Sequence, residues 1–307
     1  MKISTTLYFD RSINQLGNVQ GNLAKTQEQL STGLQIVKPS DAPDKASLVT
    51  RLESELSRQA SYQDTLKAVN VRLTAEETAL KNTSDVMVRI KELSVQAGND
   101  TLSAQDRQSV ALEIGTLRQQ ILSLANSQDS NGNYLFSGSR ANEPAFSQDS
   151  TGRVSYQGDH ARMKVNVGDN RRMNLNMPGS DAFTRVVRDD GKGGKVGVDF
   201  FQALDDLTQA VKGGDRTNIQ RGIAEIDTLQ GGISEGLGQV GADLTVVDMQ
   251  TSVLDQVVLR LKTTRSGVED LDYTEAITRM NKDQLALEAA QSSFAKISQL
   301  SLFKFLN

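Results

Sequence analysis

Residues 219–268 read IQRGIAEIDTLQGGISEGLGQVGADLTVVDMQTSVLDQVVLRLKTTRSGV, and the spacing within this stretch decides the fold. Apolar residues recur there at steps of three and four, the heptad pattern of a helix that packs along another helix. A continuous helix of about 50 residues would span roughly 75 Å. Five glycines between 231 and 241 each cost up to about 1 kcal/mol relative to Ala in a helix. We therefore expect a bend, a short break or a very close helix contact at that point. The seam comprises Ile219, Ile223, Ile226, Ile233, Leu237, Val240, Leu244, Val247, Thr251, Leu254, Val258, Leu261 and Val268.

The first half of the chain also favours long helices. Prolines stand only at positions 39, 43, 144 and 178, so residues 44–143 are free of them. Asn99 and Asp100 then indicate a break, and Ser103 is a candidate N-cap for a second helix that returns antiparallel to the first. The first apolar stripe is Val49, Leu52, Leu56, Leu66, Val69, Leu73, Leu80, Met87 and Ile90, and the second is Val110, Ile114, Leu117, Ile121 and Leu124.

Between about 134 and 198 the apolar period changes to two, which is typical of strands. Gly152, residues 168–170 and residues 191–194 supply turns between these segments. The pattern predicts a small antiparallel β domain inserted into an α-helical protein. The alternating residues are Val154 and Tyr156, then Met163, Val165 and Val167, then Met173, Leu175 and Met177, and finally Val196 and Val198.

Composition excludes several classes of protein. The 307 residues include no Cys, no Trp, one His and about 5% aromatics, which excludes disulfides and thiolate metal sites and disfavours an aromatic ligand pocket. Lys and Arg number 34 against 38 Asp and Glu, for a net charge of -4. We therefore expect no nucleic-acid partner and no membrane insertion. The start of the chain lacks the apolar stretch of a cleaved secretory signal, and this observation alone predicts a cytoplasmic protein.

The two ends of the chain place Gln within otherwise apolar seams. Near the start, Gln20 and Gln27 alternate with Leu, and near the end Gln284 and Gln291 do the same. An unsatisfied buried amide costs about 1–3 kcal/mol, so such helices should pair weakly alone. We expect these arms to become ordered when further copies complete their contacts.

No residue pattern supports catalysis, a cofactor or a metal. His160 is the only imidazole, and no His-Glu-x-x-His motif or nucleophile elbow accompanies it. If His160 lies on a strand, the adjacent Asp159 points to the opposite face. Residues 129–133 begin like a calcium loop, but Tyr134 stands where that loop needs Gly, and Arg140 stands where it needs Glu. Residues 191–195 lack the Ser or Thr of a phosphate loop, so a hairpin turn is favoured there.

Four carboxylates, Glu269, Asp270, Asp272 and Glu275, come just before or at the start of the last helix. Such a cluster could bind a metal, but the positive end of a helix dipole also favours it. We interpret it as structural.

Two blocks at opposite ends of the chain resemble the signatures of the flagellin superfamily. Residues 29–43 read QLSTGLQIVKPSDAP, similar to the Leu-Ser-Thr-Gly core and Ser-Asp turn of the N-terminal block. Residues 268–276, VEDLDYTEA, look like the matching C-terminal block. A third stretch, NYLFSGS at 133–139, is similar to the junction proteins of that superfamily rather than to filament flagellin. The signature residues are Leu30, Ser31, Gly33, Ser40, Asp41, Tyr134, Phe136, Gly138, Glu269, Asp270, Asp272 and Tyr273.

The resemblance implies a structural, non-enzymatic protein of the bacterial flagellum, located outside the cell at the junction of hook and filament. It implies unfolded type III export without a cleaved signal peptide, aided by an export chaperone. It implies a layer of copies of this chain between hook-associated protein 1 and flagellin. The fold would be mainly α, a long-helix bundle with coiled-coil terminal arms and a small antiparallel β domain.

The expected organisation is an N-terminal arm and linker at 1–43, helical parts at 44–133 and 199–268, an inserted β domain at 134–198, and a C-terminal arm at 269–307. The terminal arms would pair and pack with neighbouring copies. The residues expected to carry this packing are Leu7, Ile13, Leu16, Leu23, Leu30, Ile277, Met280, Leu287, Phe294, Ile297 and Leu300.

Three alternatives remain open on sequence grounds. The chain could be a short flagellin that forms the filament itself. The β domain could be an enzymatic or ligand-binding module carried on the helices, although no converging polar groups support it. The chain could also be a cytoplasmic coiled-coil scaffold unrelated to flagella.

Overall fold

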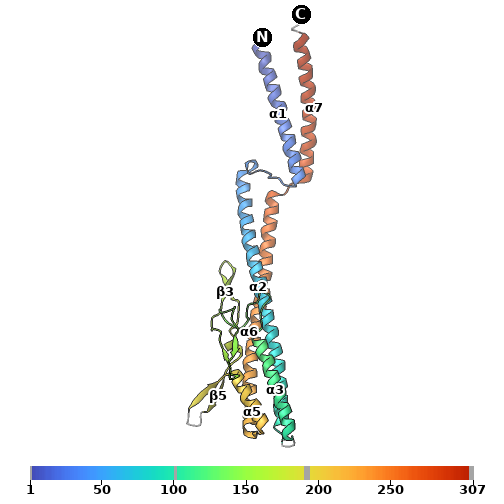
Figure 1. The fold of residues 1–307 in the computed structure, drawn as a ribbon. Helices are drawn as coiled ribbons and strands as arrows, with labels where there is room; N and C mark the ends of the chain where they lie inside the picture. The colour runs from blue at the N-terminus through green and yellow to red at the C-terminus, as the bar shows by residue number, and fades with distance from the viewer. Residues whose placement is uncertain (1, 100–101, 190–193, 304–307) are drawn as a thin grey trace. The chain divides into compact units, whose positions relative to one another are not determined.

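The computed structural model describes residues 2–99, 102–189 and 194–303. The chain forms two compact units, which are described separately below. The terminal unit comprises residues 1–59 and 256–307, and the central unit comprises residues 60–255. The division falls within two long helices (Figure 1).

Helices dominate the chain, as the periodicity predicts. The principal helices are α1 (Lys2–Thr32), α2 (Pro43–Ala97), α3 (Ala104–Ala125), α5 (Phe200–Gly213), α6 (Arg216–Glu269) and α7 (Tyr273–Phe303). Two short turns, η1 (Pro39–Asp41) and α4 (Gly179–Ala182), complete the helical elements.

The core of the central unit lies between α2 and α6. On α6 six buried residues recur every seven positions: Ile219, Ile226, Ile233, Val240, Val247 and Leu254. Gln63 on α2 donates to Asp255 on α6 at 2.6 Å, and Lys91 on α2 donates to Asp227. The partner on α6 moves back 28 positions as the residue on α2 advances 28, so the two helices run antiparallel.

The predicted break and N-cap before α3 are present. The Ser103 side chain accepts the backbone N–H of Asp106, and the Asp106 carboxylate accepts the N–H of Ser103, which forms a capping box. α3 buries Ile114 and Ile121 completely, and Arg89 on α2 donates to Glu113 on α3 at 2.9 Å.

The glycine-rich part of α6 contains no break. Its glycines instead permit close contact, the third of the outcomes expected from the sequence. A methyl group on Gly232 would lie 3.0 Å from the carbonyl oxygen of Ala182, and one on Gly236 would lie 3.1 Å from the Ala182 side chain. By contrast, Gly231 and Gly238 face open space. The segment around α4 therefore packs directly on the backbone of α6.

The antiparallel strands expected between the helical parts form three hairpins. They pair β1 (Phe146–Gln148) with β2 (Val154–Tyr156), β3 (Lys164–Gly168) with β4 (Arg171–Asn174), and β5 (Val186–Asp189) with β6 (Lys195–Val198). Each is a separate two-stranded sheet. The turn expected at 191–195 lies mostly outside the described residues.

Side-chain clusters fix these hairpins to the helices, because a two-stranded sheet is marginal alone. The ring of Phe146 lies 5.2 Å from the rings of Phe183 and Phe201, measured between centroids. Arg188 on β5 donates to both carboxylate oxygens of Glu225 on α6, at 2.6 and 2.7 Å. This bidentate pair ties the last hairpin to the long helix.

Candidate functional site

The terminal unit pairs the two ends of the chain. α1 and α7 lie side by side and antiparallel, so that the beginning of α1 and the end of α7 share one end of the pair (Figure 1). The rings of Phe9 and Phe294 meet edge to face, with centroids 4.8 Å apart. A thin seam of half-buried side chains runs between the two helices, with Leu16, Leu23 and Leu30 on α1 and Met280 and Leu287 on α7.

Several residues predicted to pack in this pair are not covered within the single chain. The exposed fractions of Leu7, Ile13 and Ile277 are 51%, 52% and 45%. The intrachain seam accommodates only one stripe of each helix, so these three side chains lie beside it. The side chains of Ile297 and Leu300 lie outside the described residues. Sequence periodicity missed Leu285, which is 69% exposed, because it stands off the seam.

The glutamines expected within the seam also lie outside it. Gln20, Gln27, Gln284 and Gln291 are exposed, so within one chain their amides remain in water and need no buried partner. The buried amide is that of Gln29, whose Nε2 donates to the carbonyl oxygen of Gln35 at 2.6 Å. Gln29 therefore stabilises the turn after α1.

The N-terminal signature makes the turn that ends α1. Gly33 has φ +72, a left-handed conformation that favours glycine, and its N–H donates to the carbonyl oxygen of Gln29. A methyl group on Gly33 would lie 2.8 Å from the hydroxyl of Tyr273. The Ser31 hydroxyl donates to the carbonyl oxygen of Glu28 within the last turn of the helix.

The two signatures meet as a short bridge between α1 and α7. Leu34 pairs with Asp270 in antiparallel fashion. The N–H of Leu271 donates to the carbonyl oxygen of Gly33 at 3.0 Å, and that of Gln35 donates to Glu269 at 2.7 Å. Because this bridge joins segments more than 200 positions apart, the matching blocks at the two ends of the sequence form one structural feature.

Asp41 closes the loop that follows the bridge. Its carboxylate accepts the backbone N–H groups of Val37 and Lys38 and lies 2.8 Å from the ammonium of Lys25. The Lys25 hydrogen bond, with the N–H of Lys38, holds the pKa of Asp41 below its ordinary value. Ser40, which lies between Lys38 and Asp41 in the sequence, is exposed.

Three of the four carboxylates near the start of α7 have structural partners. Asp272 accepts the N–H groups of Thr274 and Glu275 and so caps the helix. Glu269 pairs with Arg265 at 3.1 Å, and Asp270 accepts from the hydroxyl of Ser266. In the described part of the chain, no group of three or more acidic or His side chains could hold a metal ion.

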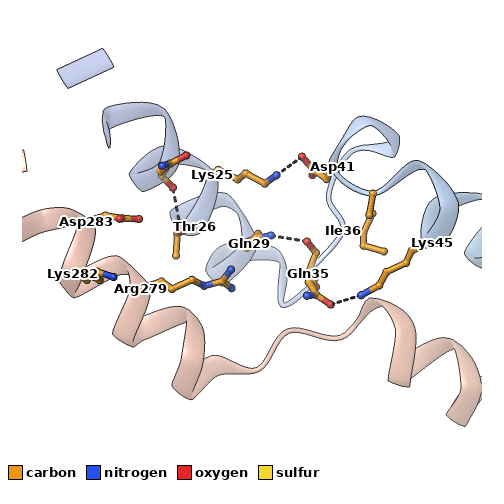
Figure 2. Close-up of a pocket in the computed structure, with 12 residues that line it drawn as sticks. Lys25, Thr26, Gln29, Gln35, Ile36, Asp41, Lys45, Arg279, Lys282 and Asp283 are labelled. Carbon is orange, nitrogen blue, oxygen red and sulfur yellow. Dashed lines mark hydrogen bonds and ion pairs between the residues drawn. The ribbon is translucent and has the colours of Figure 1, made fainter. Parts of the chain in front are cut away.

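A polar groove lies beside this bridge, between α1, the loop at 35–42 and α7 (Figure 2). Its volume is about 510 Å³. It is lined by Asn22, Lys25, Thr26, Gln29, Gln35, Ile36, Asp41, Ala42, Lys45, Arg279, Lys282 and Asp283.

The third signature lies in the central unit and shapes a turn there. Gly138 has φ +70, and Asp159 lies so close that any side chain at Gly138 would overlap it. The hydroxyl and the backbone N–H of Ser139, in that order, lower the pKa of Asp159 to about 2. Phe136 is fully buried. This signature therefore forms a tight turn that precedes the first hairpin.

A buried charge cluster, which periodicity did not reveal, joins α2 to the same region. Arg72 donates to the carbonyl oxygens of Tyr134 and Leu135 at 3.1 and 2.9 Å, and to Asp129 at 3.2 Å. Glu76, one turn further along α2, is fully buried, and burial raises its pKa to about 8. Asp129 thus pairs with an arginine and accepts the N–H groups of two residues in the following turn.

His160 contacts a serine hydroxyl rather than its sequence neighbour Asp159. It is exposed and lies in a loop after β2. Its Nδ1 lies 2.7 Å from the Ser180 hydroxyl, while Asp159 turns to Ser139. The Asp159 and His160 side chains thus have different partners and do not form a pair that could exchange a proton.

Known proteins resemble the chain along nearly its whole length. The family of bacterial flagellin N-terminal helical regions matches residues 3–141, and that of bacterial flagellin C-terminal helical regions matches residues 223–306. Flagellar hook-associated protein 3 of Salmonella typhimurium is 28% identical, covering 99% of each chain, and that of Escherichia coli is 27% identical with the same coverage.

Solved structures show the same fold. A putative flagellar hook-associated protein from Vibrio parahaemolyticus superposes with a TM-score of 0.67 at 22% identity, over 75% of this chain and 100% of that one. The two matched helical regions contain both ends of the bridge between α1 and α7. The chain therefore belongs to the bacterial flagellin family.

Proposed function

We propose that this chain is a structural subunit of the bacterial flagellum, which forms the layer that joins the hook to the filament. The observation that carries the proposal is the incomplete covering of α1 and α7. Leu7, Ile13, Ile277 and Leu285 each keep about half or more of their surface in contact with water. Apolar residues aligned along a helix pair favour contact with further copies.

The gain on assembly follows from the area that remains to be covered. Full burial of a Leu or Ile side chain contributes about 1.5–3 kcal/mol. Covering the remaining half of four such side chains therefore contributes roughly 3–6 kcal/mol per copy before entropy is subtracted. The bridge at Gly33 holds the two helices together, so both would meet a neighbouring copy as one surface.

The layer assignment rests on similarity to hook-associated protein 3 over 99% of each chain. The expected partners are copies of this chain, hook-associated protein 1 on the hook side and flagellin on the filament side. Within the described part of the chain, no helix is both long and apolar enough to cross a membrane. We expect type III export without a cleaved signal peptide, aided by an export chaperone.

A short flagellin is the alternative within the same family. The turn at 133–139 favours the junction role, because its sequence is similar to the junction proteins rather than to filament flagellin, and the chain is similar to hook-associated protein 3 over 99% of its length. An enzymatic role for the hairpin region would rest on the contact between His160 and the Ser180 hydroxyl, and no acidic side chain pairs with His160 among the described residues. The matched relatives are flagellar structural proteins.

The first test deletes residues 277–307 and asks whether cells still connect filaments to hooks. We expect hooks without filaments and the remaining chain in soluble form. Normal filaments would contradict the proposal.

A finer variant separates assembly from export, because the deletion also removes the segment expected to bind a chaperone. The double variant Ile13→Ser with Ile277→Ser should be exported but released into the medium instead of retained on the hook. Leu112→Ser is the matched control, since Leu112 is 68% exposed on the central unit. Equal retention of the double variant and the control would argue against assembly through the arms.

A further inference from the structure

The groove beside the bridge carries more positive than negative charge. Its lining contributes four cations, Lys25, Lys45, Arg279 and Lys282, and two carboxylates, Asp41 and Asp283. Figure 2 shows Arg279, Lys282 and Asp283 on α7 across from Lys25, Thr26 and Gln29 on α1. The cations thus gather from both helices and from α2.

Two of the four cations already have partners inside the groove. Lys25 pairs with Asp41 at 2.8 Å, and Lys45 donates to the side-chain oxygen of Gln35 at 3.5 Å. Within the described part of the chain, Arg279 and Lys282 make no ion pair. They stand three positions apart on α7, so they lie on one face of the helix. This leaves a guanidinium and an ammonium available to the same incoming group.

Exposed apolar surface continues directly from these cations. Leu285 stands three positions after Lys282 and so neighbours it on the helix surface. A copy that covers Leu285 would therefore bring its own surface against Lys282. The proposed assembly contact and the groove belong to one continuous face of α7.

The net charges of the two units indicate which surface of a second copy would bind at the groove. The terminal unit contains 14 Lys and Arg against 12 Asp and Glu, whereas the central unit contains 20 against 26. The terminal unit is therefore positive by two, and the central unit is negative by six. Opposite charges steer two surfaces together and set their register.

We propose that the groove binds a carboxylate of the central unit of a second copy, held by Arg279 and Lys282. This inference rests on the proposed function, because it assumes that copies pack through their arms. An arginine can hold a carboxylate with two parallel hydrogen bonds, which gives geometric specificity, and the adjacent ammonium adds a third donor. The apolar contacts supply adhesion, and the groove sets which part of the neighbour lies against the bridge.

The first experiment replaces the two cations in the full-length chain with Arg279→Glu and Lys282→Glu. The control is Arg260→Glu with Lys262→Glu, two exposed cations on α6 of the same unit. Circular dichroism and thermal melting should show both variants folded like the parent. In cells lacking the parent chain, we expect the groove variant to be exported, with its retention on hooks reduced at least tenfold relative to the control.

Equal retention of the groove variant and the control would overturn the inference. It would leave the proposed function intact if the Ile13 and Ile277 variant still failed to assemble. If that arm variant assembled normally, the proposed function itself would fail. A groove variant that does not fold would be replaced by Arg279→Gln with Lys282→Gln, which removes the charges without adding repulsion, and the same retention criterion applies.

The second experiment identifies the occupant by cross-linking. Concentrated full-length protein, mixed in equal parts with and without nitrogen-15, is treated with a carbodiimide, which couples Lys amines to carboxylates in contact. We expect links from Lys282 to carboxylates within residues 60–255 of a differently labelled copy, lost in 0.5 M NaCl. Links from Lys282 only within one copy or only to the terminal unit, or no links between copies, would overturn the identification of the occupant.

Discussion

Glu76 offers the sharpest physical test of how the hairpin region is attached to the helices. It is fully buried on α2, and its nearest cation is the Nε of Arg72 at 3.5 Å. Arg72 is already occupied by Asp129 and by two carbonyl oxygens. Among the described residues, no hydrogen bond of ordinary geometry reaches either carboxylate oxygen of Glu76, and the Met177 backbone and Arg72 offset only part of the effect of burial. Burial therefore outweighs Arg72 and raises the pKa of Glu76 to about 8 from an ordinary value of 4.5.

The sign of the pH dependence follows from this shift. Between the two pKa values the folded chain keeps a proton that the unfolded chain has released, so the free energy of unfolding falls as pH rises. The contribution is fully present below pH 4.5 and is lost as pH rises to about 8. The slope approaches about 1.4 kcal/mol per pH unit. Between about pH 5 and pH 7.5 the loss amounts to roughly 3 kcal/mol.

Glu76→Gln isolates this effect, because glutamine resembles the protonated carboxyl and does not titrate. Urea unfolding of the full chain, followed by circular dichroism from pH 5 to pH 8.5, gives the free-energy difference between parent and variant at each pH. We expect the parent to lose stability relative to the variant by roughly 3 kcal/mol between pH 5 and pH 7.5. A difference that does not change with pH would refute the reasoning, because it would mean that Glu76 is ionised throughout.

Three further predictions concern single residues. Gly33→Ala should destabilise the turn after α1 by about 1–2 kcal/mol, because Gly33 has a left-handed backbone conformation. Gly17→Ala, in open space on α1, should instead stabilise that helix. Amide exchange of residues 16–32 would distinguish the two variants, and equal effects would contradict the argument. Gly232→Ala should lower the free energy of unfolding, measured with urea, because the added methyl group meets the Ala182 carbonyl oxygen. The adjacent Gly231→Ala should raise the free energy of unfolding by up to about 1 kcal/mol. The reverse order would be inconsistent with the close packing. Asp272→Ala should cost about 1 kcal/mol through loss of the cap on α7, visible as faster amide exchange at Thr274 and Glu275, and unchanged exchange would show that the cap is dispensable.

Much of the fold could be predicted because burial in the long helices is periodic. The seam on α6 recurs every seven residues from Ile219 to Leu254, and the same positions are buried in the structure. The N-cap at Ser103 follows from local chemistry, since its partner Asp106 is only three residues away. Such short-range signals survive without knowledge of the tertiary structure.

Contacts between distant segments could not be predicted from periodicity. Gly232 and Gly236 indicated either a break or a close approach, and only the position of Ala182 decides between them. The positions of Arg72 and Glu76 on α2 do not reveal that Arg72 contacts the 129–135 segment. The strands form three separate hairpins because each pairs only with its neighbour in sequence.

The candidate site shows the same division. The signature blocks were recognised as sequences, and the structure shows why they occur together, since Gly33 and Leu271 form one bridge. The apolar arms were also recognised, but an apolar residue beside a seam looks the same in sequence as one within it. Ile13 and Leu16 differ only in the face that the partner helix covers.

The most direct test of the central claim is the position of this chain on intact flagella. A short epitope tag would be placed at Thr151, an exposed turn residue between β1 and β2, and flagella would be examined by immunogold electron microscopy. We expect the label to be confined to the boundary between hook and filament. Label along the filament would identify a flagellin, and label only inside the cell would contradict a flagellar role.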